Sequence, residues 1–559
     1  MLNSIINTVT SSLWRKILVL VGSFLLSLLV FILIWASYRG FEFSDESYYN
    51  IGYYFHTEID NPIIFFHRIY NRFFGFLSLS LAQNRVLGIV LLLFSSFFVA
   101  HASILYFNIK EKVLFSVFVA ILGFLSYAIF PMSISYNLLS AIFTAVLVGL
   151  TFLFLVKEKK RYAFFIGFFI ALMVANKFTN IAFIGYFFLV TFLIDRVKNK
   201  RANTFYLTPI LWVILGMGLG IYILFPSWTE LKLKAQEFVF GMSLTTAHSL
   251  ASMFEKIWLD VRYLLLQSIY LLPTFIVLFL VRKHKKNGVY YLFLIGIATL
   301  NFIYILFHYY YFLGKTSIYI LFFFVIILTI ALLWEKNNLH KKRDYHLIYA
   351  FVLMLVPFVS SFGTNNSLFT QFTFYGNVFA VGLFLLLNNL KYIWLRYFLL
   401  SIIVFISTAQ IIYNKIIFPY RITSPLTQQN IPITNIPYLK GIKVDAQTAD
   451  YIQQILTLKN YSESTIFLCS KELGISIITE KEPLFFTWID KNSYHLIPIY
   501  IKQQKDKLEK GSILVIPKKD KQKIPPYFLK EEKEGYTKVK EIIAPRDTLL
   551  IYRKKNAER

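Results

Sequence analysis

The sequence has almost no cysteine: Cys469 is the single one among 559 residues. An intramolecular disulfide is therefore impossible. The sequence also lacks a CxxC pair and any Cys/His spacing of the kind that binds structural zinc. Folds that depend on disulfides or on a structural zinc ion are excluded by these absences.

Acidic residues are scarce too, with 30 Asp and Glu against 57 Lys and Arg, which leaves a net charge of +27. Such a charge could indicate nucleic-acid binding. The basic residues, however, cluster in short loops between long apolar runs. We interpret these clusters as cytoplasmic loops that set membrane topology and contact anionic lipid headgroups. A nucleic-acid partner is not expected.

Apolar residues are abundant, at 57% of the chain, and the mean hydropathy is +0.59. The apolar runs are about 17–25 residues long, which is enough for a helix to cross a bilayer. No clear small-residue cleavage site follows the first run, Ile17 to Ala36, so we interpret it as a retained anchor. Densely basic loops alternate with sparser ones, and this pattern predicts about thirteen transmembrane helices.

The alternation places the N-terminus in the cytoplasm and, because the number of spans is odd, the C-terminus outside. We therefore expect a multi-pass protein of the cell inner (cytoplasmic) membrane. Residues 1–415 are predicted to form an all-α membrane domain with long outer loops at 37–83 and 226–262. Residues 416–559 are predicted to form a small periplasmic or otherwise extracytoplasmic α/β domain. The outer segment Trp228–Arg262 is predicted to be an amphipathic helix on the bilayer surface.

One helix-like run and three apolar strand-like runs predict the α/β character of the C-terminal domain. They are Ala446–Lys459 for the helix, and Thr465–Cys469, Ile513–Ile516 and Thr548–Tyr552 for the strands.

The first outer loop carries the strongest chemical signal. Asp45 and Glu46 follow the first span by only a few residues, so we expect them near the membrane surface, where Trp, Tyr, Lys and Arg are the usual residues. Tyr48 and Tyr49 come directly after them. A solvated pair of loop acids, or the N-cap of a short interfacial helix, would give the same pattern.

Further short motifs occur in a defined order along the chain. They are Asp45-Glu46-x-Tyr48-Tyr49, Asn61-Pro62 before an aromatic run, Asn84-Arg85-Val86-Leu87-Gly88, Gly167 through Asn176-Lys177-Phe178, and Gly314-Lys315 through Leu321. Together they resemble the motifs of membrane-embedded GT-C glycosyltransferases. The pattern is most similar to the branch of protein O-mannosyltransferases and lipid A aminoarabinose transferases, although the usual double proline is Asn61-Pro62 here.

The resemblance implies a GT-C fold and transfer of a sugar from a polyprenyl-phosphate carrier, with inversion at the anomeric carbon. The acceptor would be lipid A or another glycan, a glycolipid or a protein. Because phosphate leaves readily, the reaction needs a base for the acceptor hydroxyl and positive charge for the phosphate. Asp45 is the candidate base and Glu46 an orienting or secondary acid, with Tyr48 and Tyr49 as candidates for binding the acceptor or the sugar.

Cationic side chains on the outer side are the candidates for the donor phosphate. Lys177 comes first, because an ammonium in a very short turn between apolar spans is costly without an anionic partner. A snorkelling lysine at a helix end is the alternative. The other candidates are Lys315, Arg68, Arg72 and Arg85. One or two of these arginines are expected to meet the phosphate or the candidate base, and the rest to meet lipid headgroups.

Other polar segments leave alternatives open. Glu58 and Asp60 form a second acidic pair that competes for the catalytic role. Asn365 and Asn366, in a loop rich in amides and hydroxyls, could bind sugar hydroxyls or form a plain turn. The outer histidines show no metal-ligand spacing. We therefore assign no cofactor, and the sequence leaves open whether a divalent metal takes part.

Two other functions are alternatives. One is an O-antigen polymerase or ligase, which also combines many spans with long outer loops, and the other is a lipid-linked sugar flippase or transporter. The early Asp-Glu pair and the folded outer tail favour the transferase. Transporters usually show paired hydrophobic halves and polar residues at midspan, and neither is evident. The sequence does not identify the sugar, the acceptor or the carrier length.

Overall fold

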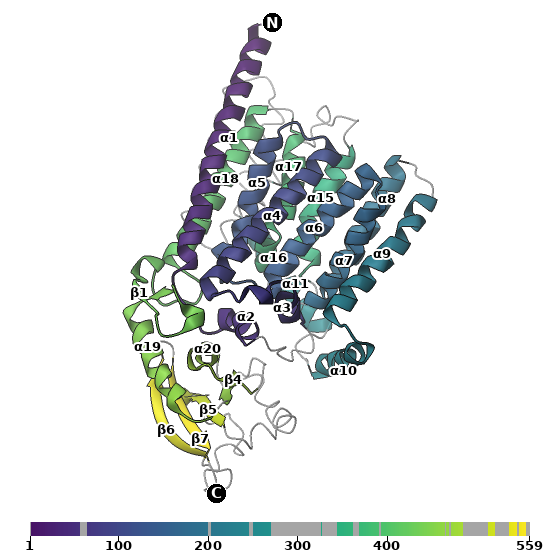
Figure 1. Cartoon of the computed structure of the whole chain (residues 1–559). Coiled ribbons are helices and arrows are strands. Elements are labelled where there is room, and N and C mark those ends of the chain that lie inside the picture. The colour runs from purple at the N-terminus through teal and green to yellow at the C-terminus, as the bar shows by residue number, and fades with distance from the viewer. Residues whose placement is uncertain are drawn as a thin grey trace. The chain divides into compact units, whose positions relative to one another are not determined.

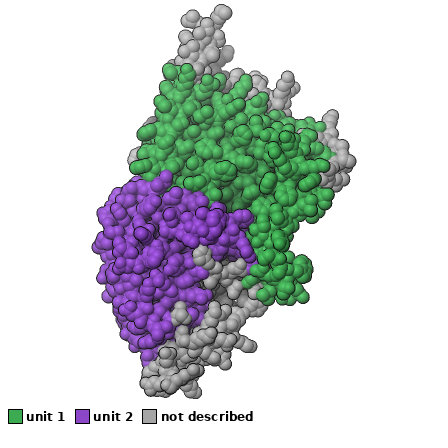
Figure 2. All heavy atoms as spheres, viewed as in Figure 1, with its two compact units in different colours: residues 1–33, 89–130, 136–415 green, residues 34–88, 131–135, 416–559 purple. Residues whose placement is uncertain are grey.

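The computed structural model describes residues 2–55, 64–199, 203–244, 250–269, 326, 344–361, 368–390, 393–463, 465–468, 471–484, 512–519, 536–544 and 547–554. The chain is divided into two compact units (Figure 2). The helical unit comprises residues 1–33, 89–130 and 136–415, and the mixed unit comprises residues 34–88, 131–135 and 416–559. The segment between the first two spans therefore belongs to the same unit as the C-terminal residues.

The described part of the helical unit is built of helices. Several of them are α1 (Leu2–Ser37), α4 (Leu81–Phe107), α5 (Lys112–Gly123), α6 (Tyr136–Lys157), α7 (Lys160–Asn176), α8 (Asn180–Asn199), α9 (Asn203–Leu224), α10 (Trp228–Leu244), α11 (Leu250–Ile269), α15 (Asp344–Val359), α16 (Leu368–Phe374), α17 (Gly376–Asn388) and α18 (Ile393–Ile417). Helices α1, α4 and α18 continue into the mixed unit at one end. The predicted amphipathic helix over Trp228–Arg262 falls on α10 and α11, and residues 245–249 lie outside the described part.

Five helices of the described residues are long and apolar enough to cross a membrane. They are Leu13–Ser37, Leu81–Phe107, Tyr136–Lys157, Asn180–Asn199 and Leu395–Ile417. A sixth span is possible if Pro209–Leu224 and Trp228–Gln236, which meet at a bend of 84°, count as one. Several predicted spans fall within residues 270–343, which apart from residue 326 lie outside the described part, so the number of about thirteen stays a prediction.

Helices α7 and α9 approach each other closely because a glycine of each helix faces the backbone of the other. A Cβ atom on Gly167 would lie 1.9 Å from the carbonyl oxygen of Val213, and one on Gly216 would lie 1.9 Å from that of Phe164. Any side chain at these positions would push the two backbones apart. Small residues at such contacts are typical of helices that pack in a membrane, where close backbone approach supplies the packing energy.

The C-terminal part of the mixed unit contains a small α/β fold, as the sequence predicts (Figure 1). Its five-stranded sheet has the order β4-β3-β5-β7-β6, and its helices include α19 (Ala446–Leu456) and α20 (Gly474–Thr479). The strands are β3 (Thr465–Leu468), β4 (Glu482–Pro483), β5 (Ser512–Pro517), β6 (Tyr536–Ile543) and β7 (Thr548–Lys554). Strand β3 pairs with β4 and β5 in parallel, whereas β7 pairs with β5 and β6 antiparallel. All residues of β5 are buried, as expected of an apolar strand inside a sheet.

Backbone hydrogen bonds attach the segment after α1 to the C-terminal residues of the same unit. The amide of Gly40 donates to the carbonyl of Lys443 at 2.8 Å, and the amide of Lys443 donates to the carbonyl of Tyr38 at 2.9 Å. The amide of Gly474, in α20, donates to the carbonyl of Phe43 at 2.8 Å. The acidic segment that follows Phe43 is thus held on the C-terminal part of the mixed unit.

Candidate functional site

Helix α2 (Asp45–Tyr54) begins at the acidic pair, so both carboxyl groups lie in its first turn. Acidic side chains there are stabilised by the positive end of the helix dipole. Successive residues of a helix point about 100° apart, and this rotation sends the two carboxylates to different partners. Asp45 and Glu46 therefore form two separate sites rather than one.

Glu46 is buried and forms a bidentate ion pair with Arg85, from the first turns of α4. The Nε and Nη2 atoms of Arg85 donate to the two carboxylate oxygens at 2.8 and 2.5 Å. Ser133 donates to the same carboxylate at 2.7 Å. Burial opposes ionisation, but the charge of Arg85 and the hydrogen bonds from Arg85 and Ser133 outweigh it and lower the pKa of Glu46.

The remaining donors of Arg85 cap the end of α1 and the turn after it. Its guanidinium also donates to the carbonyl oxygens of Ser37, Arg39 and Gly40, at 3.0, 3.1 and 2.9 Å. A guanidinium has five N–H groups, and these three bonds with the two to Glu46 account for all of them. The sequence predicts Arg85 as a candidate for contact with the donor phosphate or the candidate base, and in the structure all of its N–H groups have partners inside the protein.

Asp45 is the more accessible of the two acids, with 15% of its side chain exposed. Its partners come from the segment that follows α18. The hydroxyl of Tyr420 donates to Oδ2, and Nη1 of Arg421 donates to Oδ1 at 2.7 Å. The same Nη1 donates to Oγ of Ser44 at 2.7 Å. Each carboxylate oxygen of Asp45 thus has a donor from the C-terminal part of the chain.

Glu42 is a third carboxyl group in the same segment, and sequence reasoning missed it. Its Oε1 accepts hydrogen bonds from the backbone amide of Ser44, at 2.9 Å, and from the Ser44 hydroxyl. Its Oε2 accepts from the amide of Glu46 at 2.7 Å. Burial, and next the negative charge of Asp45, raise the pKa of Glu42 to about 8 in spite of these hydrogen bonds.

The raised pKa of Glu42 predicts a specific pH dependence of stability. Between its ordinary pKa of 4.5 and about 8, the folded chain holds a proton that the unfolded chain releases. The contribution of this proton to the free energy of unfolding is fully present below pH 4.5. It is lost as pH rises to about 8, by at most about 1.4 kcal/mol per pH unit. We therefore expect the Tm of the wild type minus that of Glu42→Gln to fall between pH 6 and pH 9. A difference that does not change with pH would show that Glu42 is ionised in the folded chain.

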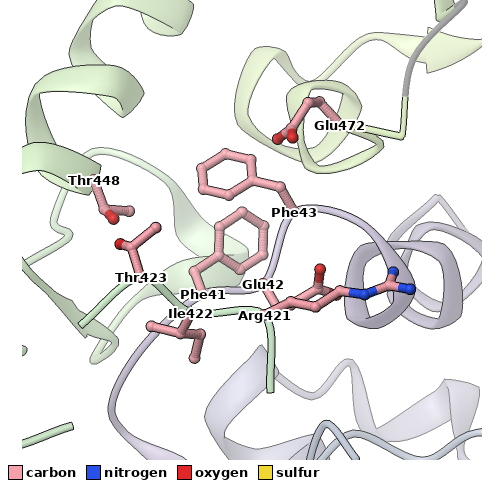
Figure 3. Close-up of a pocket in the computed structure, with 8 residues that line it drawn as sticks. All are labelled: Phe41, Glu42, Phe43, Arg421, Ile422, Thr423, Thr448 and Glu472. Atoms are coloured by element: carbon pink, nitrogen blue, oxygen red, sulfur yellow. The ribbon is translucent and has the colours of Figure 1, made fainter. Parts of the chain in front are cut away.

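A pocket opens beside this acidic segment (Figure 3). Its lining consists of Phe41, Glu42, Phe43, Arg421, Ile422, Thr423, Thr448 and Glu472. The rings of Phe41 and Phe43 lie next to each other with centroids 4.8 Å apart. Aromatic rings, carboxyls and hydroxyls together are groups that can bind a hydroxylated ligand.

The tyrosines of the acidic motif are buried and pack on the neighbouring helix α3 (Phe66–Phe74). The ring of Phe66 lies 6.0 Å from that of Tyr48 and 5.9 Å from that of Tyr49, between centroids. His67 has its Nε2 at 3.2 and 3.1 Å from the carbonyl oxygens of the same tyrosines. Burial lowers the pKa of His67 to about 3. This imidazole is therefore neutral at pH 7 and packs among the aromatic rings.

The arginines predicted for phosphate on α3 differ in exposure. Arg68 is buried, whereas Arg72, one turn further along the helix, is exposed. Arg72 is thus the more accessible of the two to a headgroup or a phosphate.

Lys177 lies in the helical unit, directly after α7, and only 6% of it is exposed. Its Nζ donates to Oδ1 of Asn137 at 3.2 Å and lies 5.6 Å from the centroid of the Tyr136 ring. Two more amides stand close by: those of Asn176 and Asn180 donate to the hydroxyl of Ser140 at 2.8 and 3.0 Å. The lysine is therefore part of a buried polar cluster at the α7–α8 turn.

The other predicted site residues lie outside the described part of the chain. They are Lys315, Asn365, Asn366, and the alternative acidic pair Glu58 and Asp60. Within the described residues, no group of three or more His, Cys, Asp or Glu side chains could hold a metal ion. The residues that sequence reasoning missed are Glu42, Tyr420 and Arg421. For Glu42 the sequence gives one signal, its position three residues before Asp45, where the acidic motif begins.

Comparisons with known proteins find similarity among solved structures. No protein-family model matches the sequence, and no curated protein matches it. Among solved structures, the chain is similar to the crystal structure of ArnT from Cupriavidus metallidurans in the apo state, with 11% sequence identity. The similarity covers 95% of this chain and 97% of that chain, at a TM-score of 0.39. At these values the similarity does not establish the family of the chain.

Proposed function

We propose that this protein is a membrane-embedded glycosyltransferase of the GT-C type. It moves a sugar from a polyprenyl-phosphate carrier to an acceptor on the outer side of the membrane. The observation that carries the proposal is Asp45: a partly exposed carboxylate at the start of a helix, with one donor on each oxygen. A carboxylate has about four lone-pair sites, so this group keeps capacity to accept a hydrogen bond from an acceptor hydroxyl.

With Asp45 as the base, each step of the transfer can be assigned. Asp45 accepts the proton of the acceptor hydroxyl while the hydroxyl oxygen attacks the anomeric carbon. The bond between this carbon and the phosphate oxygen breaks, and the carrier phosphate leaves with the electron pair. Attack on the face opposite the phosphate inverts the configuration. No general acid is required, because the leaving group is already an anion.

Within this proposal, Glu46 and Arg85 support the base without touching substrate. Their buried ion pair fixes the start of α2 against the end of α1. All five N–H groups of this arginine have partners inside the protein. The phosphate is therefore assigned to other cations.

Lys177 is our candidate for the carrier phosphate. A buried ammonium among amides and a hydroxyl is positioned to give a charge-assisted hydrogen bond to an anion. Such a bond contributes roughly 1.5–3 kcal/mol. We expect Lys177→Ala to weaken binding of polyprenyl phosphate in lipid nanodiscs by about tenfold or more.

Lys159, the exposed N-cap residue at the other end of α7, provides the matched control. Lys159→Ala removes the same charge from the same helix and should leave the Kd near the wild-type value. Equal losses in the two variants would remove Lys177 from the phosphate site.

A further inference from the structure

The hydrogen-bond donors to Asp45 come from residues 375 and 376 positions further along the chain. Tyr420 and Arg421 follow α18, and they approach opposite oxygens of the carboxylate, Oδ2 and Oδ1. A carboxylate held at both oxygens cannot rotate freely about its χ2 bond. Its remaining lone pairs therefore keep a fixed direction, which is what a general base needs to meet a hydroxyl.

The backbone conformation around Arg421 places its side chain beside Asp45. Arg421 has a φ of +52°, in the left-handed region that a residue other than glycine adopts only when its surroundings require it. Its neighbour Ile422 packs on Gly40, where a Cβ atom would lie 2.4 Å from Ile422 Cδ1. Gly40 itself has a φ of +70°, so the turn after α1 leaves room for this segment at a position that only glycine suits.

Arg421 connects the base to the start of its helix. Its Nη1 atom bridges Oδ1 of Asp45 and Oγ of Ser44, the N-cap residue of α2. Burial, with the negative charge of Asp45, raises the pKa of Tyr420 above its usual range. The phenol therefore stays protonated and remains a donor at neutral pH.

We infer that Tyr420 and Arg421 are positioning residues for Asp45, so that the segment after α18 completes the catalytic base. This inference rests on the proposed function, because it assigns to Asp45 the role of a base. The C-terminal part of the mixed unit then has a role in the reaction, because it contains the two side chains that orient the carboxylate.

The test compares single substitutions in the full-length protein. The substrate is a membrane lipid extract that contains polyprenyl-phosphate sugars, and mass spectrometry follows the release of free polyprenyl phosphate. Tyr420→Phe and Arg421→Ala should each lower kcat by about tenfold or more, the loss expected for one charge-assisted hydrogen bond. KM for the lipid donor should stay within about twofold. Arg421→Lys, which keeps the positive charge, should recover part of kcat.

Tyr438→Phe is the matched control. Tyr438 also lies in the C-terminal segment and also bonds to α2, but its hydroxyl donates to Asn50 at 2.6 Å rather than to Asp45. Its loss should leave kcat unchanged. Equal losses of kcat in Tyr420→Phe and Tyr438→Phe, or wild-type kcat in both Tyr420→Phe and Arg421→Ala, would overturn the positioning role.

Asp45→Asn separates the two levels of the proposal. If this variant loses transfer while the Tyr420 and Arg421 variants keep it, the positioning role fails and the proposed function stands. If Asp45→Asn retains transfer, the proposed base fails and the positioning role fails with it.

Discussion

Asp45→Asn is expected to slow transfer from a polyprenyl-phosphate sugar by at least about 100-fold. Asparagine keeps the volume of the side chain and accepts a hydrogen bond, but it cannot take a proton at neutral pH. A positioned base contributes about 10²–10⁴-fold to a rate, so the lower figure sets the minimum loss. The initial rate of release of polyprenyl phosphate measures this effect, with the amount of folded protein and the binding of donor lipid as checks.

Asp60→Asn is the matched control, because Asp60 belongs to the competing acidic pair with Glu58. Its effect should be much smaller. A near-normal rate in Asp45→Asn together with a collapse in Asp60→Asn would move the base to the second pair. Normal rates in both would remove the base from this loop and favour the polymerase or the transporter.

Arg85→Met should be among the most destabilising single changes in the mixed unit. It leaves the buried carboxylate of Glu46 without its cation, and breaking one partner of a buried pair costs about 3–5 kcal/mol. The carbonyl oxygens of Ser37, Arg39 and Gly40 lose their donor as well. Thermal unfolding in detergent should show this as a large fall in Tm at pH 7.

The double variant Arg85→Met with Glu46→Gln is the check on that mechanism. Removing the carboxylate charge should restore part of the loss, so the two effects should not add. The pKa of Glu46 is lowered in the folded wild type, so the pair stabilises above the usual carboxyl range and loses this effect as pH falls. The Tm deficit of Arg85→Met should therefore shrink as pH falls below the ordinary carboxyl pKa of 4.5. Additive effects and a constant deficit would show that Arg85 acts through its backbone contacts alone.

Local patterns were sufficient to predict several elements of the fold. The apolar runs predicted β3, β5 and β7, because these strands pair on both sides and bury their side chains. Strand β6 was missed because it carries Lys538, Lys540 and Glu541 and has few buried residues, as an exposed edge strand does. Strand β4 has two residues and leaves no periodicity to detect.

The candidate site shows more clearly that local patterns do not predict which distant residues meet. The sequence identified Asp45 and Glu46 as neighbours in a motif, and their proximity suggested one shared site. The helix that begins at Asp45 separates them, so that Glu46 pairs with Arg85 while Asp45 meets Tyr420 and Arg421. The last two lie 375 and 376 residues away along the chain. No local pattern relates residues at such separations, because the contacts exist only once the mixed unit has folded.

The released carrier lipid provides the most direct test of the proposed function. Purified wild-type protein would be reconstituted with a membrane lipid extract that contains polyprenyl-phosphate sugars and candidate acceptors. Mass spectrometry would identify the carrier after the reaction, and NMR would give the anomeric configuration of the product. We expect free polyprenyl monophosphate to form in step with a product of inverted configuration. Release of a carrier diphosphate, a product of retained configuration, or an unchanged carrier would contradict the proposal.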